Sequence, residues 1–233
     1  IDTEANPSGR ISIGMAQAAC NVLAIPLTQA IQTHYPNVEL IVHCGTTDFL
    51  NQWLNNGQID LAVTYENAAA EKHFCSTPLI KEHIYLVVGT EQHSELYQGL
   101  IQKNSIEFKQ LAEFEIILPN QNDPLVQLLN RYETQTGVRI WNKQNFGLLM
   151  TNLRYVTDGL GLMILPSSAV FHLEKSKQVK TIAITQPELS RDVLLESNAK
   201  RPSSIAMQVA SKTILKLTEE AHSLGNWRGQ LLF

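Results

Sequence analysis

Two short loops carry the residues that are best suited to hold a small molecule. The first contains Ala16, Gln17 and Ala18, and it joins a strand expected at residues 10–15 to a helix expected at 18–34. The first N–H groups of a helix have no intrahelical acceptor, and the helix dipole places partial positive charge there. Such a loop can therefore receive a carboxylate or a carbonyl group, although the same residues also suit an ordinary strand–helix turn.

The second loop repeats this arrangement with Gly45, Thr46 and Thr47, which follow a strand at 38–43 and open a helix at 47–55. Glycine permits close approach of a ligand to the backbone, and the two hydroxyls can donate or accept hydrogen bonds. Thr46, Thr47 or Asp48 could equally serve as a simple N-cap. One threonine can do both, since its hydroxyl can cap the helix while a ligand binds the backbone amides.

Catalytic or metal-binding spacings do not occur in the sequence. The seven histidines, at positions 34, 43, 73, 83, 93, 172 and 222, show no His-x-x-x-His pair, and there is no Gly-x-Ser-x-Gly elbow. The segment from Asp158 to Gly161 lacks the spacing of a phosphate loop and follows a helix, so Gly159 is interpreted as a helix stop. We therefore expect no metal, no cofactor and no enzyme activity.

The three cysteines, Cys20, Cys44 and Cys75, are an odd number without paired spacing. This pattern argues against a disulfide framework and is typical of a reducing cytosol, so we expect a cytoplasmic protein. Free cysteine is among the most buried residue types, and we expect these to be small core residues. A redox pair would need two of them close in space, and their spacing gives no sign of that.

The elements that must position the two loops alternate between strand and helix. Pro26 lies inside the helix at 18–34, where it should bend it, and Gly57 should end the helix at 47–55 in a left-handed conformation. A strand at 60–64 follows. Short connections between such elements predict a mainly parallel sheet with right-handed crossovers. Helices that start at the carboxyl ends of its strands are where open α/β sheets bind ligands.

The pattern then restarts after a strand at 84–88 and a looser polar stretch at 93–104. The elements expected next are strands at 115–118, 139–143, 162–165 and 179–184, with helices at 124–136 and 146–157. An extended run at 189–195 and a long amphipathic helix at 203–224 complete the chain. The restart indicates a second α/β lobe built like the first.

Composition excludes several classes of protein. The chain has 233 residues, is 44% hydrophobic and 17% charged, and carries a formal net charge of −4 with its Lys and Arg scattered. It can bury a sizeable core, and it lacks the basic footprint of a nucleic-acid binder. No apolar run approaches the ~20 residues of a membrane span. The polar opening at Ile1 lacks a secretory signal, and without an initial Met we expect a fragment of a longer protein.

Five segments in order resemble the effector-binding domain of LysR-type transcriptional regulators. They are Gly9-Arg10-Ile11-Ser12-Ile13-Gly14, Tyr35-Pro36-Asn37-Val38-Glu39-Leu40, Gly57-Gln58-Ile59-Asp60-Leu61-Ala62-Val63, residues 78–87 and Gly159-Leu160-Gly161-Leu162-Met163-Ile164-Leu165-Pro166. The resemblance covers the chain from Gly9 onward. Trp53-Leu54 and residues 61–66 resemble the nitrogen-assimilation-control subgroup.

This resemblance implies an α/β fold of the periplasmic-binding-protein type (type II), with two Rossmann-like lobes joined by two crossing strands. Lobe one would comprise 9–86 plus 188–233 and lobe two 87–187, with crossings near 85–89 and 187–193. The winged helix–turn–helix domain of the family would precede Ile1 and is absent from this chain. DNA would then be bound only through that domain, and the regulator would be a homodimer or homotetramer.

The resemblance also implies a small-molecule effector between the lobes, for example a carboxylate or another small anion. The effector-binding positions that match are Ala16, Gln17, Ala18, Gly45, Thr46, Thr47, Asn145, Phe146 and Pro166. The family often has Ser or Thr in the first loop and an Arg near 123–127, and this chain has neither there. A strongly anionic effector is therefore less expected than the fold suggests.

Two other functions remain open from the residues. A solute-binding protein of a transporter shares the same architecture, but the missing export signal and the unpaired cysteines count against it. A small enzyme on this fold would need a nucleophile, an acid/base pair or a metal set, and none can be assembled from the sequence. Architecture alone does not decide among these functions.

Overall fold

The computed structural model describes residues 6–66, 73–92, 94–119, 121, 123–143 and 146–233. The chain divides into two compact units. Unit 1 comprises Ile1–Glu82 and Asp192–Phe233, and unit 2 comprises His83–Arg191. Each unit has its own sheet and its own apolar core.

Unit 1 is built on three parallel strands, β1 (Gly9–Ala16), β2 (Val38–Gly45) and β3 (Leu61–Tyr65). β1 lies between the other two and pairs with both in parallel. Its buried face is fully enclosed, with Ile11, Ile13 and Met15 at 0% exposure. β2 stands at the end of the strand order, has only one neighbour, and is fully buried only at Val38.

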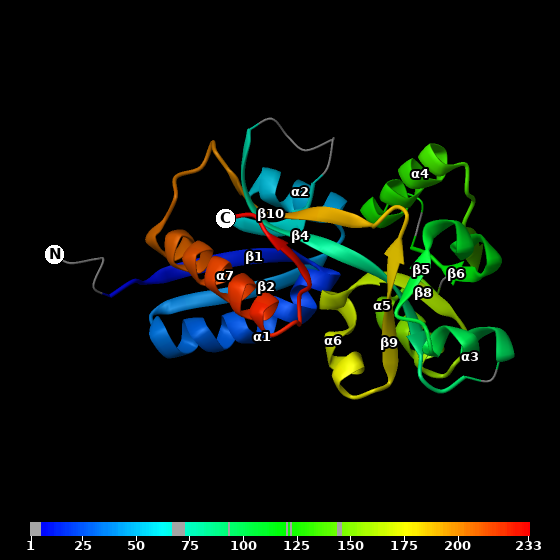
Figure 1. Cartoon of the computed structure of the whole chain (residues 1–233). Coiled ribbons are helices and arrows are strands. Elements are labelled where there is room, and N and C mark those ends of the chain that lie inside the picture. Colours follow the sequence, from blue (N-terminus) through cyan, green and yellow to red (C-terminus); the bar gives the residue numbers. More distant parts are fainter. Residues whose placement is uncertain (1–5, 67–72, 93, 120, 122, 144–145) are drawn as a thin grey trace. The chain divides into compact units, whose positions relative to one another are not determined.

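Three helices cover this sheet: α1 (Gln17–His34), α2 (Thr47–Asn56) and α7 (Ile205–Ser223). β1–α1–β2 steps one way along the sheet and β2–α2–β3 steps back, so right-handed crossovers place α1 and α2 on opposite faces (Figure 1). α7 packs against α1, although the two helices lie far apart in the sequence (Figure 1). Gly57 ends α2 at φ 75°, as predicted.

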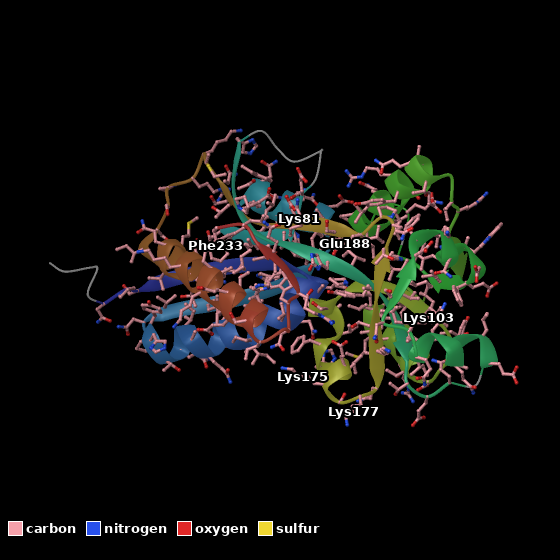
Figure 2. The ribbon with its side chains drawn as sticks, in the orientation of Figure 1. Lys81, Lys103, Lys175, Lys177, Glu188 and Phe233 are labelled. Carbon is pink, nitrogen blue, oxygen red and sulfur yellow. The ribbon has the colours of Figure 1, made fainter. Side chains whose placement is uncertain are left out.

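The C-terminal segment completes unit 1. β10 (Ser190–Asn198) pairs antiparallel with β3, and β11 (Gly229–Leu231) pairs antiparallel with β4 (Phe74–Gly89). This pairing brings Trp227, which is fully buried, onto Glu82, and its Nε1–H donates to Glu82 Oε2 at 2.7 Å. Lys81 of β4, labelled in Figure 2, has its Nζ 3.8 Å from the Asp192 carboxylate near the start of β10.

Unit 2 contains a second α/β arrangement. Its strands are β5 (Ser105–Glu107), β6 (Glu115–Ile117), β7 (Trp141–Lys143), β8 (Leu162–Pro166) and β9 (Val179–Thr185), together with the second half of β4. Its helices are α3 (Glu95–Ile101), α4 (Pro124–Thr136), α5 (Leu149–Thr157) and α6 (Ser167–Lys175), with a 3-10 turn at Phe108–Glu113. β6 pairs in parallel with β7 and β8, and β4 pairs antiparallel with β8 and β9.

One apolar core cluster in the described part of unit 2 is formed by residues of that unit alone. It runs from Ile84 to Leu189 and includes the fully buried Phe108, Leu111 and Ile116. A cis peptide bond precedes Pro187 in the turn between β9 and β10. Glu188, labelled in Figure 2, lies in this turn with one carboxylate oxygen 3.5 Å from His83 Nδ1.

Several sequence predictions differ from the structure. The stretch at 93–104, expected to be loose, contains the helix α3, and β4 begins at Phe74 rather than at residue 84. The helix expected at 146–157 begins at Leu149. The first residues of β4 are mostly exposed and carry no apolar alternation, so the sequence pattern does not indicate a strand there. In the structure β4 lies next to β10 in the strand order, and β11 pairs with it at Ile80–Glu82.

The cysteines differ as well, since they are not small core residues. Cys44 and Cys75 are exposed, and Cys20 is half-buried. Cys44 lies near the end of β2, the strand with one neighbour, and Cys75 lies in the exposed first part of β4. Trp141 is also exposed, at 55%, and the Arg139 guanidinium lies 5.4 Å from its ring centre.

Candidate functional site

The carboxyl ends of β1 and β2 lie side by side in unit 1. Met15 is the register partner of Cys44, and Ala16 is the partner of Gly45. α1 begins at the next residue of one strand, and α2 begins two residues after the other. The structure therefore brings six of the predicted positions, 16–18 and 45–47, to one edge of one sheet, where two helices present N–H groups without intrahelical acceptors.

In the first loop, only Gln17 offers a side chain to solvent. Ala16 is 3% exposed and Ala18 6%, so their methyl groups belong to the core and only their backbone can contact a ligand. Ala16 occupies the N-cap position and makes no side-chain cap, and the first turn of α1 holds no acidic residue. The positive end of the α1 dipole is thus uncompensated by side chains of its own first turn.

In the second loop, the two threonines have different environments. Thr46 is exposed, and as the N-cap of α2 it makes no side-chain cap, contrary to its possible capping role. Thr47 is 3% exposed, and its hydroxyl accepts a hydrogen bond from Thr64 on β3 at 3.4 Å. The Thr46 hydroxyl is consequently the one suited to a ligand, whereas Thr47 joins α2 to the sheet.

An aromatic cluster beside Gly45 was not predicted as part of the site. A Cβ at Gly45 would stand 3.0 Å from the Trp53 ring, so a larger residue there would require the ring to shift by a few tenths of an ångström. Trp53 stacks on Phe49 with ring centres 5.9 Å apart and also lies near His43. Phe49 and Trp53 are four residues apart on α2, and this helical spacing is the sequence signal that could have identified the cluster.

Cys20 and Cys44 meet at the same edge. Cys20 is the fourth residue of α1, and Cys44 lies on β2 beside Met15. The hydrogen bond between the two thiols lowers the pKa of Cys44 to about 7, against the opposing effect of burial. The same hydrogen bond, together with burial and the charge on Cys44, raises the pKa of Cys20. The sequence spacing of the two cysteines did not predict this pair. The parallel register of β1 and β2, which places Cys44 beside Met15 just before α1, could have indicated it.

The predicted positions of unit 2 are less uniform. Phe146 is 42% exposed, and its ring centre lies 5.4 Å from that of Tyr155. Pro166 is buried at the end of β8 and serves as the N-cap of α6. Asn145 lies outside the described residues.

Two negative findings bear on the chemistry of the described part of the chain. No group of three or more His, Cys, Asp or Glu side chains there could hold a metal ion. Among the same residues, no helix has both the length and the apolar character needed to cross a bilayer.

The fold is that of the periplasmic-binding-protein-like domains, a mixed α/β fold with mostly parallel strands in the sheet around which each unit is built. The chain belongs to the LysR substrate-binding domain family, whose model matches residues 4–217. It is thus the substrate-binding domain of a LysR-type regulator, and the resemblance inferred from the sequence is confirmed.

Curated relatives are transcriptional regulators of the same family. The chain is 26% identical over 225 residues to the nitrogen assimilation regulatory protein Nac of Klebsiella aerogenes, covering 96% of this chain and 70% of that protein. It is likewise 26% identical over 224 residues to the regulator CzcR of Bacillus cereus, with 96% and 70% coverage.

Solved structures share the fold at lower identity. The effector-binding domain of QuiR in complex with shikimate superposes with a TM-score of 0.76 at 18% identity, covering 91% of this chain and 98% of that one. An H2O2-bound OxyR mutant of Corynebacterium glutamicum gives 0.76 at 17% identity, with 96% and 69% coverage.

Proposed function

We propose that the chain binds a small-molecule effector at the edge where β1 and β2 end, and that it passes this signal to an attached DNA-binding domain. The observation that carries the proposal is the register pairing of Ala16 with Gly45, which places the starts of α1 and α2 together. Backbone N–H groups of both helices would hold a carboxylate or similar group, and the hydroxyl of Thr46 would add a direct hydrogen bond.

The residues around this edge favour a modestly charged, hydrogen-bonding effector. No Lys or Arg occurs between residues 11 and 71, so neither loop brings a cationic side chain of its own. The ring of Trp53 beside Gly45 would pack against an apolar part of the molecule. From unit 2, we propose that Phe146 and the backbone at Pro166 contact the same effector, as the family resemblance implies.

The mechanism would be a shift between conformational states, which requires that the effector bind one state more tightly than the other. The whole regulator would act in the cytoplasm as a homodimer or homotetramer and bind DNA through its helix–turn–helix domain. The chain itself would catalyse no reaction. A transporter's solute-binding protein is the alternative, and turnover of a bound ligand would instead favour an enzyme.

The direct test is titration calorimetry of the chain with a panel of small carboxylic acids, followed by Thr46→Val. Loss of one hydrogen bond to a ligand group costs about 1–1.5 kcal/mol, so a bound acid should weaken roughly tenfold. Thr33→Val is the matched control, because Thr33 is exposed in the last turn of α1, at the opposite end of that helix. Equal affinity in Thr46→Val and in the unmodified chain would remove Thr46 from the site.

The link to DNA is tested separately by reading the coding sequence upstream of Ile1. About 60–90 further residues containing a helix–turn–helix pair would support the regulator mechanism. A short apolar export signal there would support the solute-binding alternative and overturn the DNA-linked mechanism.

A further inference from the structure

We propose that Phe49, Trp53 and His43 form a docking surface on unit 1 for a basic segment of a partner protein, with an arginine of that segment seated on the Phe49 ring. These three residues, called the α2 aromatic patch below, come from α2 and β2. The proposal does not rest on the proposed function, because the patch needs no bound effector.

The three rings of the patch are contiguous. Phe49 and Trp53 are one helical turn apart, and their rings stack with centres 5.9 Å apart and an angle of 21° between the planes. The ring centre of His43 lies 6.0 Å from that of Trp53. Trp53 also covers Gly45, which shares a face of β2 with His43, since alternate residues of a strand point the same way. One continuous aromatic surface therefore spans α2 and the end of β2.

The patch is open to solvent at the border of the sheet, where β2 is the last strand. Phe49 is 54% exposed and His43 is exposed, whereas Trp53 between them is half-buried. Single exposed apolar side chains are normal on a protein surface, but a stacked pair that continues into a third ring is not. Phe and Trp are enriched at the centres of protein–protein interfaces, where they add contact area. The patch therefore has the composition of an interface.

The charge around the patch favours a cationic partner. Residues 11–66 include no Lys or Arg, and they carry four carboxyl groups, on Glu39, Asp48, Asp60 and Glu66. Asp48 directly precedes Phe49 and is exposed. The lysines of α7 belong to the other face of the sheet, because α7 packs on α1 (Figure 1). The Arg201 guanidinium lies against Gly57, at the opposite end of α2 from Phe49.

An arginine side chain matches both the rings and the charge. Its planar guanidinium stacks on an aromatic face and is attracted by the ring quadrupole, and its apolar stem can cover neighbouring surface. Unit 2 contains such a contact of its own, with the Arg139 guanidinium 5.4 Å from the ring centre of Trp141. Because an open patch encloses little of a small cation, we assign the patch to an arginine held within a protein segment.

The test titrates the chain with a blocked peptide of alternating Gly and Arg, and follows the indole N–H signals by NMR. The chain has three tryptophans, so two of the signals are internal controls. Trp227 is fully buried and donates to Glu82, and Trp141 already has an arginine beside it. Trp53→Phe identifies the Trp53 signal. We expect a saturable shift of that signal alone, and none with a peptide that has Gln in place of Arg.

Four variants separate the contributions to peptide binding. Phe49→Leu keeps an apolar side chain but removes the ring, so affinity for the Arg peptide should fall about two- to fivefold, as for a cation–π contact at an exposed site. Leu96→Ala is the matched control, since Leu96 is 56% exposed on α3 of unit 2, and it should change nothing. Asp48→Asn should weaken binding and reduce its dependence on salt. Thr46→Val should leave peptide binding unchanged, so this proposal and the effector site can fail independently.

The proposal is overturned if the Gln peptide shifts the Trp53 signal as much as the Arg peptide does, or if Phe49→Leu binds the Arg peptide with unchanged affinity. A Trp53 shift that grows with protein concentration in the absence of peptide would assign the patch to a second copy of the chain. Equal saturation by a single blocked arginine at the same concentration would make the patch a small-cation site. Either of these results also overturns the assignment to a partner protein.

Discussion

A buried carboxyl group on β10 links single-residue chemistry to the stability of unit 1. Glu196 is 2% exposed, and one of its carboxylate oxygens accepts a hydrogen bond from the Ser76 hydroxyl at 3.0 Å. Burial raises the pKa of Glu196, and the hydrogen bond from Ser76 opposes this effect. The folded chain thus binds this proton more tightly than the unfolded chain does.

Stability should accordingly decrease as the pH rises through the interval between the ordinary glutamate pKa and the raised pKa of Glu196. The folded state holds more protons in that interval, so the free energy of unfolding contributed by this group is greatest below it and lost above it. Glu196→Gln keeps the shape without the charge. We expect it to be more stable than the unmodified chain at neutral pH, with the difference vanishing in acid.

Urea unfolding at several pH values measures this effect. Glu39→Gln, on an exposed position of β2, is the matched control and should leave the pH profile nearly unchanged. A Glu196→Gln profile parallel to that of the unmodified chain would mean that burial does not penalise this carboxylate.

At the residue scale, the sequence predicted which residues lie at the edge where β1 and β2 end better than it predicted what each of these residues does there. Strand ends and helix starts located residues 16–18 and 45–47, because the 3.6- and 2-residue periods identify elements directly. Burial of Ala18 and Thr47, and the meeting of Cys20 with Cys44, depend on register and packing. A linear pattern does not contain that information.

At the scale of elements, α3 is a helix that the sequence pattern did not predict. It has seven residues, no side-chain cap at Ser94, and a glycine in its interior. Gly99 costs the helix conformational entropy, and a Cβ there would meet nothing within 4 Å. The polar composition of the α3 segment therefore predicted a loop. The strand predicted at 84–88 was shorter than β4 for a similar reason. The first half of β4 has no apolar alternation of its own, and its neighbours β10 and β11 come from a distant part of the sequence.

Gly99→Ala should therefore stabilise the chain by about 0.5–1 kcal/mol, because alanine loses less backbone entropy in a helix. Urea unfolding of the purified protein measures the difference. Gly137→Ala is the matched opposite: its Cβ also meets nothing within 4 Å, but Gly137 caps α4 at φ 72°. Left-handed backbone should cost alanine about 1–2 kcal/mol. Changes of the same sign in both variants would contradict this account of α3.

At the scale of the whole molecule, the chain path makes the two units unequal. Unit 2 is one continuous segment, 83–191, whereas unit 1 is assembled from both ends of the chain. The core cluster described for unit 2 falls entirely between Ile84 and Leu189. Unit 1 instead requires α7, which packs on α1 and buries Ala210, Ile214 and Leu217. The predicted lobe boundaries at 86 and 187 rest on the family resemblance, and the structure divides within β4 and β10.

This inequality predicts different behaviour for two fragments. Residues 83–191 should fold alone, because the core cluster described for that unit, from Ile84 to Leu189, lies entirely within them. Residues 1–82 should not, since each buried apolar side chain contributes about 1.5–3 kcal/mol and loss of α7 removes several. That loss approaches the 5–15 kcal/mol typical of a whole domain. Circular dichroism and amide NMR dispersion distinguish the outcomes, and adding residues 192–233 in trans should restore order to 1–82. A well-dispersed spectrum from 1–82 alone would show that the parallel strands and α1 hold together without the C-terminal helix.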